Sequence, residues 1–177
     1  MSRLPNPNKT AHPFTLTDIT GTTQIFERES DDSPTLLFFF KHDCATCELT
    51  APLLQHIHNE LSGNGLRVIG ISQDTAEDTA IFIRENDLTF AITLDTELDC
   101  SAEYGFDAVP ALVLANSNHL VLASFEGFAK SDLANLVALA ATQCDRMAPP
   151  LDSLLATLPE ERPGCGSRIH APAIARR

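Results

Sequence analysis

Short apolar runs alternate along the chain with longer segments in which apolar residues recur every three or four positions. Residues 35–41 (TLLFFFK) and 66–72 (LRVIGIS) are runs of the kind that forms strands buried on both faces of a sheet. Between them, leucine and isoleucine recur at helical spacing from Leu49 to Leu61, and the Gly63-Asn64-Gly65 sequence ends the helix. This part of the chain is therefore predicted to form a strand, a helix and a second strand.

Similar signals extend this order on both sides. Loose alternation over residues 14–26 predicts a short hairpin, and the Asn116-Ser117-Asn118 turn joins two further predicted strands. Because strands alternate with helices, we predict an α/β fold whose central mixed sheet has parallel neighbours, antiparallel edge strands and flanking helices. The remaining predicted elements are a helix over 75–86 capped by Thr75, a strand over 90–94, a short helix over 97–104, strands over 111–115 and 119–125, and a closing helix from Leu133 to Ala140.

The same pattern divides the chain into three parts. Residues 1–13 are rich in proline and asparagine and predict an irregular lead-in, whereas residues 14–143 hold the periodic segments of one domain. The periodicity breaks after residue 143 and Ala148-Pro149-Pro150 follows. We therefore interpret residues 144–177 as a C-terminal extension that either wraps the domain or stays flexible.

Composition narrows the classes of partner. Apolar residues make up 44% of the chain, enough to form a core, and the net charge is −12 with no basic cluster in the body of the chain. Nucleic acid and anionic membranes both need stripes of lysine and arginine, so we expect neither as a main partner. The sequence also lacks the roughly 18 to 20 consecutive apolar residues of a membrane span.

The N-terminus and the cysteine count bear on the compartment. Residues Met1 to Asn8 lack the hydrophobic region of a secretory signal, so we expect a cytoplasmic protein. Five cysteines, an odd number, do not predict a disulfide framework in a reducing compartment. Paired cysteines there favour a catalytic or metal-binding role.

Cys44 and Cys47 stand where the first buried strand passes into the helix. The free N–H groups and positive dipole end of a helix N-terminus stabilise a thiolate, which lowers a thiol pKa from about 8.5 to roughly 3.5–7.5 in C-x-x-C proteins. The spacing places Cys47 one helical turn on, close enough to attack a disulfide formed at Cys44. We therefore expect Cys44 to be exposed and nucleophilic, and Cys47 to be shielded and to resolve the intermediate.

Two prolines complete a family pattern. Pro52 follows Cys47 by five residues inside the predicted helix, where a proline costs about 3 kcal/mol in a plain helix. About sixty residues later comes YGFDAVPALVL, with Val109-Pro110 before a strand. The buried strand, C-x-x-C pair and two prolines together resemble the thioredoxin-fold redoxin proteins, relatives of TlpA-type and AhpC/TSA-like thiol–disulfide oxidoreductases. The resemblance runs from roughly Phe14 to Thr142.

This resemblance implies a thioredoxin-like fold for residues 14–143 and a redox role for the cysteine pair. Pro52 would bend the active-site helix, and Pro110 would follow a cis peptide bond facing the cysteines. Val109 and Pro110 would frame an extended substrate chain through the Val109 backbone. The implied substrates are protein disulfides or small thiols, an upstream dithiol supplies electrons, and neither a metal nor an organic cofactor is implied. The oligomeric state is left open.

Four positions depart from the thioredoxin pattern. Asp43 precedes Cys44 where thioredoxins have tryptophan, and Ala45-Thr46 replaces their Gly-Pro inside the pair. Phe38 stands six residues before Cys44, where thioredoxins carry a buried aspartate that assists proton transfer. The reduction potential is therefore open within the range of about −270 to −120 mV that related scaffolds span.

Two other functions compete with disulfide exchange. Peroxiredoxins carry a P-x-x-x-[ST]-x-x-C pattern, and alignment on Cys47 places Cys44 at the threonine position and Phe40 at the proline position. Both defining residues of a thiol peroxidase are thus missing. The third hypothesis is a non-catalytic binding module with a thioredoxin fold, but such a module has no need of both thiols.

A metal site and a role for Cys165 are two further hypotheses. A structural zinc site needs four ligands, and only a half site of His42, Cys44 and Cys47 with the distant Cys165 can be drawn. Cys165 lies in the basic-flanked PGCGSR sequence of the extension, where we expect an exposed, reactive thiol. Cys165 is a candidate accessory thiol that exchanges with Cys44. The alternative, which we favour from the sequence alone, is that the segment around Cys165 is an inert tail or contacts a partner.

Overall fold

The computed structural model describes residues 4–27 and 33–170, with a central five-stranded sheet in the order β5-β4-β3-β7-β8. The middle strand β3 pairs parallel to β4 and antiparallel to β7, which confirms the predicted mixed sheet in an α/β fold. The strands are β3 (Thr35–Phe40), β4 (Arg67–Ser72), β5 (Ala91–Leu94), β7 (Ala111–Ala115) and β8 (Val121–Glu126).

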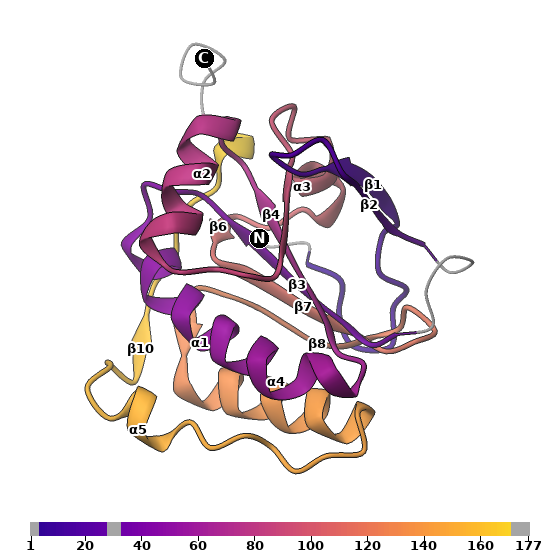
Figure 1. Ribbon diagram of the computed structural model, residues 1–177, viewed down its shortest axis with the longest axis vertical. Helices are drawn as coiled ribbons and strands as arrows, with labels where there is room; N and C mark the ends of the chain where they lie inside the picture. The colour runs from indigo at the N-terminus through magenta and orange to yellow at the C-terminus, as the bar shows by residue number, and fades with distance from the viewer. Residues whose placement is uncertain (1–3, 28–32, 171–177) are drawn as a thin grey trace.

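Helices cover this sheet. Figure 1 shows α1 and α4 next to each other on one face, below the sheet in that view, while α2 lies away from α4. None of the helices in the described ranges combines the length and the apolarity needed to cross a bilayer. The helices are α1 (Ala45–Leu61), α2 (Ala76–Glu85), α3 (Asp99–Tyr104) and α4 (Lys130–Gln143), with the 3-10 turn η1 (Ser62–Asn64) after α1.

The core centres on β3, whose six residues are all buried. The Phe38 and Phe40 rings stack with centroids 4.9 Å apart, and Phe39 packs against Tyr104 with centroids 4.7 Å apart. Burial on both faces is the reason for the continuous apolar run in the sequence. This rigid strand leads directly into the Cys44–Cys47 segment.

Gly70 on β4 makes room for the Phe40 ring. A Cβ added at Gly70 would lie 2.9 Å from Ile92 Cγ1 and 3.2 Å from the Phe40 ring. We expect Gly70→Ala to lower the free energy of unfolding by about 1–3 kcal/mol through overpacking, measured by urea denaturation. Gly63→Ala is the matched control, because its Cβ would meet nothing within 4 Å. Equal stability of both variants would contradict the close packing.

The lead-in and the hairpin border the sheet. Residues 4–13 form no named strand, but Asn8 and Ala11 donate backbone hydrogen bonds to Val121 and His119, each at 2.8 Å. The predicted hairpin is formed by β1 (Phe14–Thr17) and β2 (Thr23–Phe26), which pair antiparallel. Residues 1–3 of the predicted lead-in lie outside the described residues.

The described part of the C-terminal extension, residues 144–170, returns to the cysteine end of the sheet. Figure 1 shows it in orange to yellow, passing from α5 through β10 along the side where α1 begins. Two-residue strands fasten it: β10 pairs with β9, and β11 pairs with β6. Such short strands carry no periodicity and were not predicted. The elements are β6 (Ala108–Val109), β9 (Phe128–Ala129), α5 (Asp152–Leu155), β10 (Glu161–Arg162), β11 (Cys165–Gly166) and the 3-10 turn η2 (Arg168–His170).

Candidate active site

Cys44 is the N-cap residue of α1. Its backbone is extended (φ −131°, ψ 103°), and its Sγ accepts the Cys47 N–H at 3.3 Å. A sulfur thus takes the place that a serine or aspartate oxygen usually fills at a helix start. All five cysteines are free thiols, so the structure describes the reduced dithiol.

The surroundings of Cys44 favour its thiolate. Hydrogen bonding from the Cys47 thiol lowers the Cys44 pKa most, against the opposing effect of burial, and the Cys165 thiol and the N–H groups of Cys47 and Thr46 add to it. The Val109 carbonyl, which accepts from the neutral Cys44 thiol at 3.4 Å, works against ionisation, but the donors outnumber it. Together they lower the pKa of Cys44 from 9.0 to about 5.

Cys47 has the opposite character. Burial raises the pKa of its thiol well above the ordinary value, and the adjoining Cys44 sulfur raises it further, while the Lys41 N–H partly opposes this. Two thiols with pKa values pushed apart can act as a nucleophile and a proton-holding partner. The directions of the two shifts are those that the expected roles require, and the roles themselves stay a prediction.

A titration of the reduced protein tests this asymmetry. We expect the ultraviolet absorbance of one thiolate to appear with a midpoint at pH about 5 and to vanish as the pH falls through it. Because the unfolded value is the higher one, Cys44 also adds stability that is complete above pH 9.0 and lost towards pH 5. Cys44→Ser is the control and should remove the transition; a midpoint near 9.0 in the wild type would contradict the assignment.

The predicted exposure of Cys44 is wrong. Both Cys44 and Cys47 have 0% exposed surface. The reason lies in the C-terminal extension: the Thr46 hydroxyl donates to the Pro163 carbonyl at 2.8 Å, and Cys165 contacts the Cys44 sulfur. The extension therefore covers the sulfurs, and the helix does not bury Cys44 by itself.

Val109 and Pro110 lie beside the pair, as the resemblance implies. The Val109–Pro110 peptide bond is cis, and both residues are buried. The Val109 carbonyl contacts Cys44, and its backbone pairs with Cys165 in β11. The backbone that would hold a substrate chain is thus occupied by the chain's own extension.

Pro52 lies on the exposed face of α1, and the helix continues through it from Ala45 to Leu61. A proline has no N–H to donate, so one intrahelical hydrogen bond is missing at this point. The Thr50 hydroxyl donates to the Thr46 carbonyl one turn earlier at 2.7 Å. The bend of the active-site helix at Pro52 stays a prediction.

A charged group that sequence reasoning missed borders the cysteines. His42, Asp43 and Asp74 place their ligand atoms within 4.8 Å of one another, and within the described ranges this is the sole such group of three or more. It contains no cysteine, so the described part of the chain does not bring together the half zinc site of His42, Cys44, Cys47 and Cys165. The Arg168 guanidinium pairs with both carboxylates, donating to Asp74 at 2.7 Å and to Asp43 at 3.0 Å. In the sequence, only the position of Arg168 directly after PGCGS could have indicated these ion pairs.

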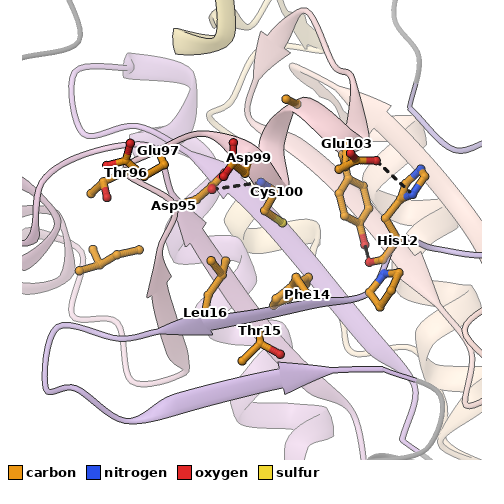
Figure 2. Close-up of a pocket in the computed structure, with 14 residues that line it drawn as sticks. His12, Phe14, Thr15, Leu16, Asp95, Thr96, Glu97, Asp99, Cys100 and Glu103 are labelled. Atoms are coloured by element: carbon orange, nitrogen blue, oxygen red, sulfur yellow. Dashed lines mark hydrogen bonds and ion pairs between the residues drawn. The ribbon is translucent and has the colours of Figure 1, made fainter.

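A separate pocket of about 510 Å³ lies between β1 and α3. Figure 2 shows Cys100 and Asp95 in it, with the Cys100 N–H bound to the carboxylate at 3.2 Å, and His12 facing Glu103. Burial raises the pKa of the Cys100 thiol, which makes it a poor nucleophile. Of the residues that line the pocket, none belongs to the cysteine pair, the Val109–Pro110 step or the extension.

Comparison with known proteins places the chain in a family. The model of the AhpC/TSA family matches residues 7–124, which include the cysteine pair and Pro110. The chain belongs to the AhpC/TSA family. The match ends before the extension, so the segment that covers Cys44 in this AhpC/TSA protein lies outside the part that defines the family.

Two curated proteins are similar over part of this AhpC/TSA chain. A thioredoxin-like protein of Haemophilus influenzae is 24% identical over 111 residues, 62% of this chain and 64% of its own. The thiol-disulfide oxidoreductase ResA of Halalkalibacterium halodurans is 27% identical over 106 residues, 59% and 60% of the two chains. The match thus spans less than two thirds of either relative.

Solved structures show that this member of the AhpC/TSA family has a thioredoxin-like fold. A thioredoxin domain of a Bacteroides vulgatus thiol-disulfide oxidoreductase superposes with a TM-score of 0.67 at 22% identity, covering 76% of this chain and 97% of its own. A hypothetical protein of Sinorhizobium meliloti superposes with a TM-score of 0.74 at 17% identity, covering 97% and 98%. The wider coverage of the second takes in the extension.

Proposed function

We propose that the protein is a thiol–disulfide oxidoreductase that works through the Cys44–Cys47 dithiol. The observation that carries the proposal is the pairing of a low-pKa thiol at the α1 N-cap with a buried, high-pKa thiol that contacts it. Thiolate attack on a disulfide needs the first, and release of the product needs the second. The ResA and thioredoxin-like relatives support the same class of chemistry.

The cycle has two exchange steps. The Cys44 thiolate attacks one sulfur of a substrate disulfide, the substrate S–S bond breaks, and the leaving thiolate takes a proton. Cys47 then gives up its proton and attacks Cys44 Sγ, which breaks the mixed disulfide and releases the second substrate thiol. The substrate gains two electrons, the pair becomes a Cys44–Cys47 disulfide, and an upstream dithiol restores it.

Access to Cys44 requires movement of the extension. Both sulfurs are fully buried, and β11 is hydrogen-bonded to the Val109 backbone. A protein substrate that uses Val109 and Pro110 must therefore replace β11 on β6 before Cys44 can attack. A two-residue strand pair at the edge of a domain is the kind of element that opens locally.

Peroxide reduction, the chemistry of the neighbouring peroxiredoxins, fits less well. The cysteine at the aligned position is Cys47, and its raised pKa keeps it protonated at neutral pH. A thiol must be ionised to attack peroxide efficiently. The low-pKa sulfur instead stands at the position where that pattern has threonine.

Turnover of insulin disulfides, with dithiothreitol as electron donor, tests the proposed function. The wild-type protein is expected to accelerate reduction above the rate of dithiothreitol alone, and the pair to cycle between dithiol and disulfide. A rate equal to dithiothreitol alone would contradict the proposal. Retention of partners by Cys44→Ser with unaltered affinity and no loss of function would favour a binding module instead.

A further inference from the structure

The extension occupies the site as a substrate strand would. Strand β11 pairs antiparallel with β6, with Cys165 opposite Val109 and Gly166 opposite Ala108. Adding a strand to an exposed backbone edge is a general way to bind an extended peptide. The chain therefore supplies its own peptide to the Val109 edge, in the position that the proposed function gives to a substrate.

This pairing places a third sulfur on Cys44. Cys165 lies opposite Val109, whose carbonyl accepts from the Cys44 thiol at 3.4 Å, and the two thiols are close enough for each to shift the other's pKa. Cys44 therefore has a thiol partner on either side, Cys47 within α1 and Cys165 from the extension. A sulfur in this second place is where a substrate disulfide would present its attacked atom.

Contacts on both sides of Cys165 hold it there. Before it, Gly164 lies so close to β6 that an added Cβ would be 2.8 Å from the Val109 carbonyl oxygen. After it, the Ser167 N–H donates to the Asp107 carbonyl at 3.0 Å, and the Gln73 amide donates to the Ser167 hydroxyl at 2.9 Å. Gln73 and Ser167 are only 3% and 4% exposed, so these are buried polar contacts of a fitted segment.

The Arg168 ion pairs complete the attachment. Its guanidinium pairs with Asp43, which precedes α1, and with Asp74, which precedes α2. Asp74 is 5% exposed, and its second oxygen accepts the His42 N–H at 2.6 Å. A buried carboxylate with a matched cation is costly to separate, which favours a specific docked position for residues 163–168.

We propose that Cys165 is a third redox thiol of this site, which exchanges with Cys47 for the bond to Cys44. This rests on the proposed function of the Cys44–Cys47 pair. The Cys165 thiolate attacks Cys44 Sγ of the Cys44–Cys47 disulfide, the Cys44–Sγ bond to Cys47 breaks, and the Cys47 thiolate takes a proton. One disulfide is exchanged for another, so no external oxidant or reductant is consumed.

The chemistry favours this exchange when Cys44 is oxidised. In the dithiol state, burial raises the pKa of Cys165, and the hydrogen bond and charge of the Cys44 thiolate raise it further. Once Cys44 is in a disulfide, its charge is gone, whereas the Thr46 N–H and the Lys41 charge still favour the Cys165 thiolate. Cys165 thus becomes more acidic in the state in which it has to attack.

Disulfide mapping of Cys47→Ser tests the proposal. The variant is treated with oxidised glutathione, which links Cys44 to glutathione and releases one reduced glutathione. Because Cys165 already touches Cys44, its effective concentration exceeds the millimolar level of a flexible tether, and it should displace the glutathione. We expect a Cys44–Cys165 disulfide as the main product by non-reducing peptide mass spectrometry, and persistent glutathione on Cys44 in Cys47→Ser/Cys165→Ser.

The outcomes separate the two proposals. A stable Cys44–glutathione adduct with free Cys165 in Cys47→Ser would overturn the role of Cys165 and leave the proposed function standing. A Cys44 thiol that forms neither a glutathione adduct nor a disulfide would overturn both. Cys47→Ser/Cys144→Ser is the matched control, since Cys144 lies at the C-terminal end of α4 and should leave the Cys44–Cys165 product unchanged. In the wild type, Cys165→Ser should remove the Cys44–Cys165 peptide and keep Cys44–Cys47.

Discussion

Cys44→Ser is expected to lose insulin disulfide reduction by about a thousandfold or more, down to the rate of dithiothreitol alone. A serine hydroxyl at the α1 N-cap can still accept the Cys47 N–H, so the helix start should be kept. The hydroxyl is not ionised at neutral pH and cannot form a mixed disulfide. The loss therefore reports on the chemistry at Cys44 and not on the fold.

Cys100→Ser and Cys144→Ser serve as controls for this result. Cys100 lies in the pocket between β1 and α3, and Cys144 follows α4, so neither belongs to the pair. Both variants should keep wild-type turnover. If Cys44→Ser kept wild-type turnover and a circular dichroism spectrum like that of the wild type, Cys44 would not be the nucleophile.

Cys47→Ser/Cys165→Ser should also lose turnover, but by a different route. Its Cys44 can still attack a substrate disulfide, yet neither of the two thiols beside Cys44 is left to release the product. We expect covalent mixed disulfides between Cys44 and the substrate chain, seen as a mass increase that dithiothreitol removes. Cys47→Ser alone should trap less substrate, because Cys165 contacts Cys44 and displaces the bound chain.

The trapping of substrate on Cys44 has a background control and a result that would contradict the assignment. Cys44→Ser/Cys47→Ser should trap nothing, and this double variant is the background for the measurement. If Cys47→Ser turned over insulin at the wild-type rate without Cys165, the assignment of Cys47 as the resolving thiol would be wrong. The raised pKa of Cys47 already makes it the weaker of the two nucleophiles.

The local signals around the cysteines were sufficient to predict the centre of the site. A buried strand, a helix start and two cysteines three residues apart place Cys44 at an N-cap, and the structure has it there. The same reasoning predicted the strands before and after α1, because β3 and β4 are buried and therefore appear in the sequence as apolar runs. Periodicity works where an element is long enough to bury one face or both.

The cover over the site could not be predicted in this way. Strands β10 and β11 have two residues each, and their partners β9 and β6 are equally short. Pairs of this length leave no alternation in the sequence, and their register depends on contacts with residues far away along the chain. The expected exposure of Cys44 failed for this reason, since the sequence does not show which tail folds back.

The polar surroundings of the site depended on the same fold-back. The carboxylate of Asp43, next to Cys44 in the sequence, would by itself oppose a thiolate there, but it pairs with Arg168 at 3.0 Å and with Lys41 at 3.6 Å. Its charge is therefore largely compensated by cations beside it. Phe38, at the position of the thioredoxin aspartate, is buried and stacks on Phe40, so it offers no proton acceptor to Cys47.

The reduction potential of the Cys44/Cys47 couple in glutathione buffers, read by peptide mapping, tests the central claim most directly. We expect a reversible two-electron transition between the dithiol and a Cys44–Cys47 disulfide, within the range of about −270 to −120 mV of related couples. The low pKa of Cys44 stabilises the reduced form and favours the upper part of that range. Two thiols that stay reduced in every buffer, or a bond that never joins Cys44 to Cys47, would contradict the account.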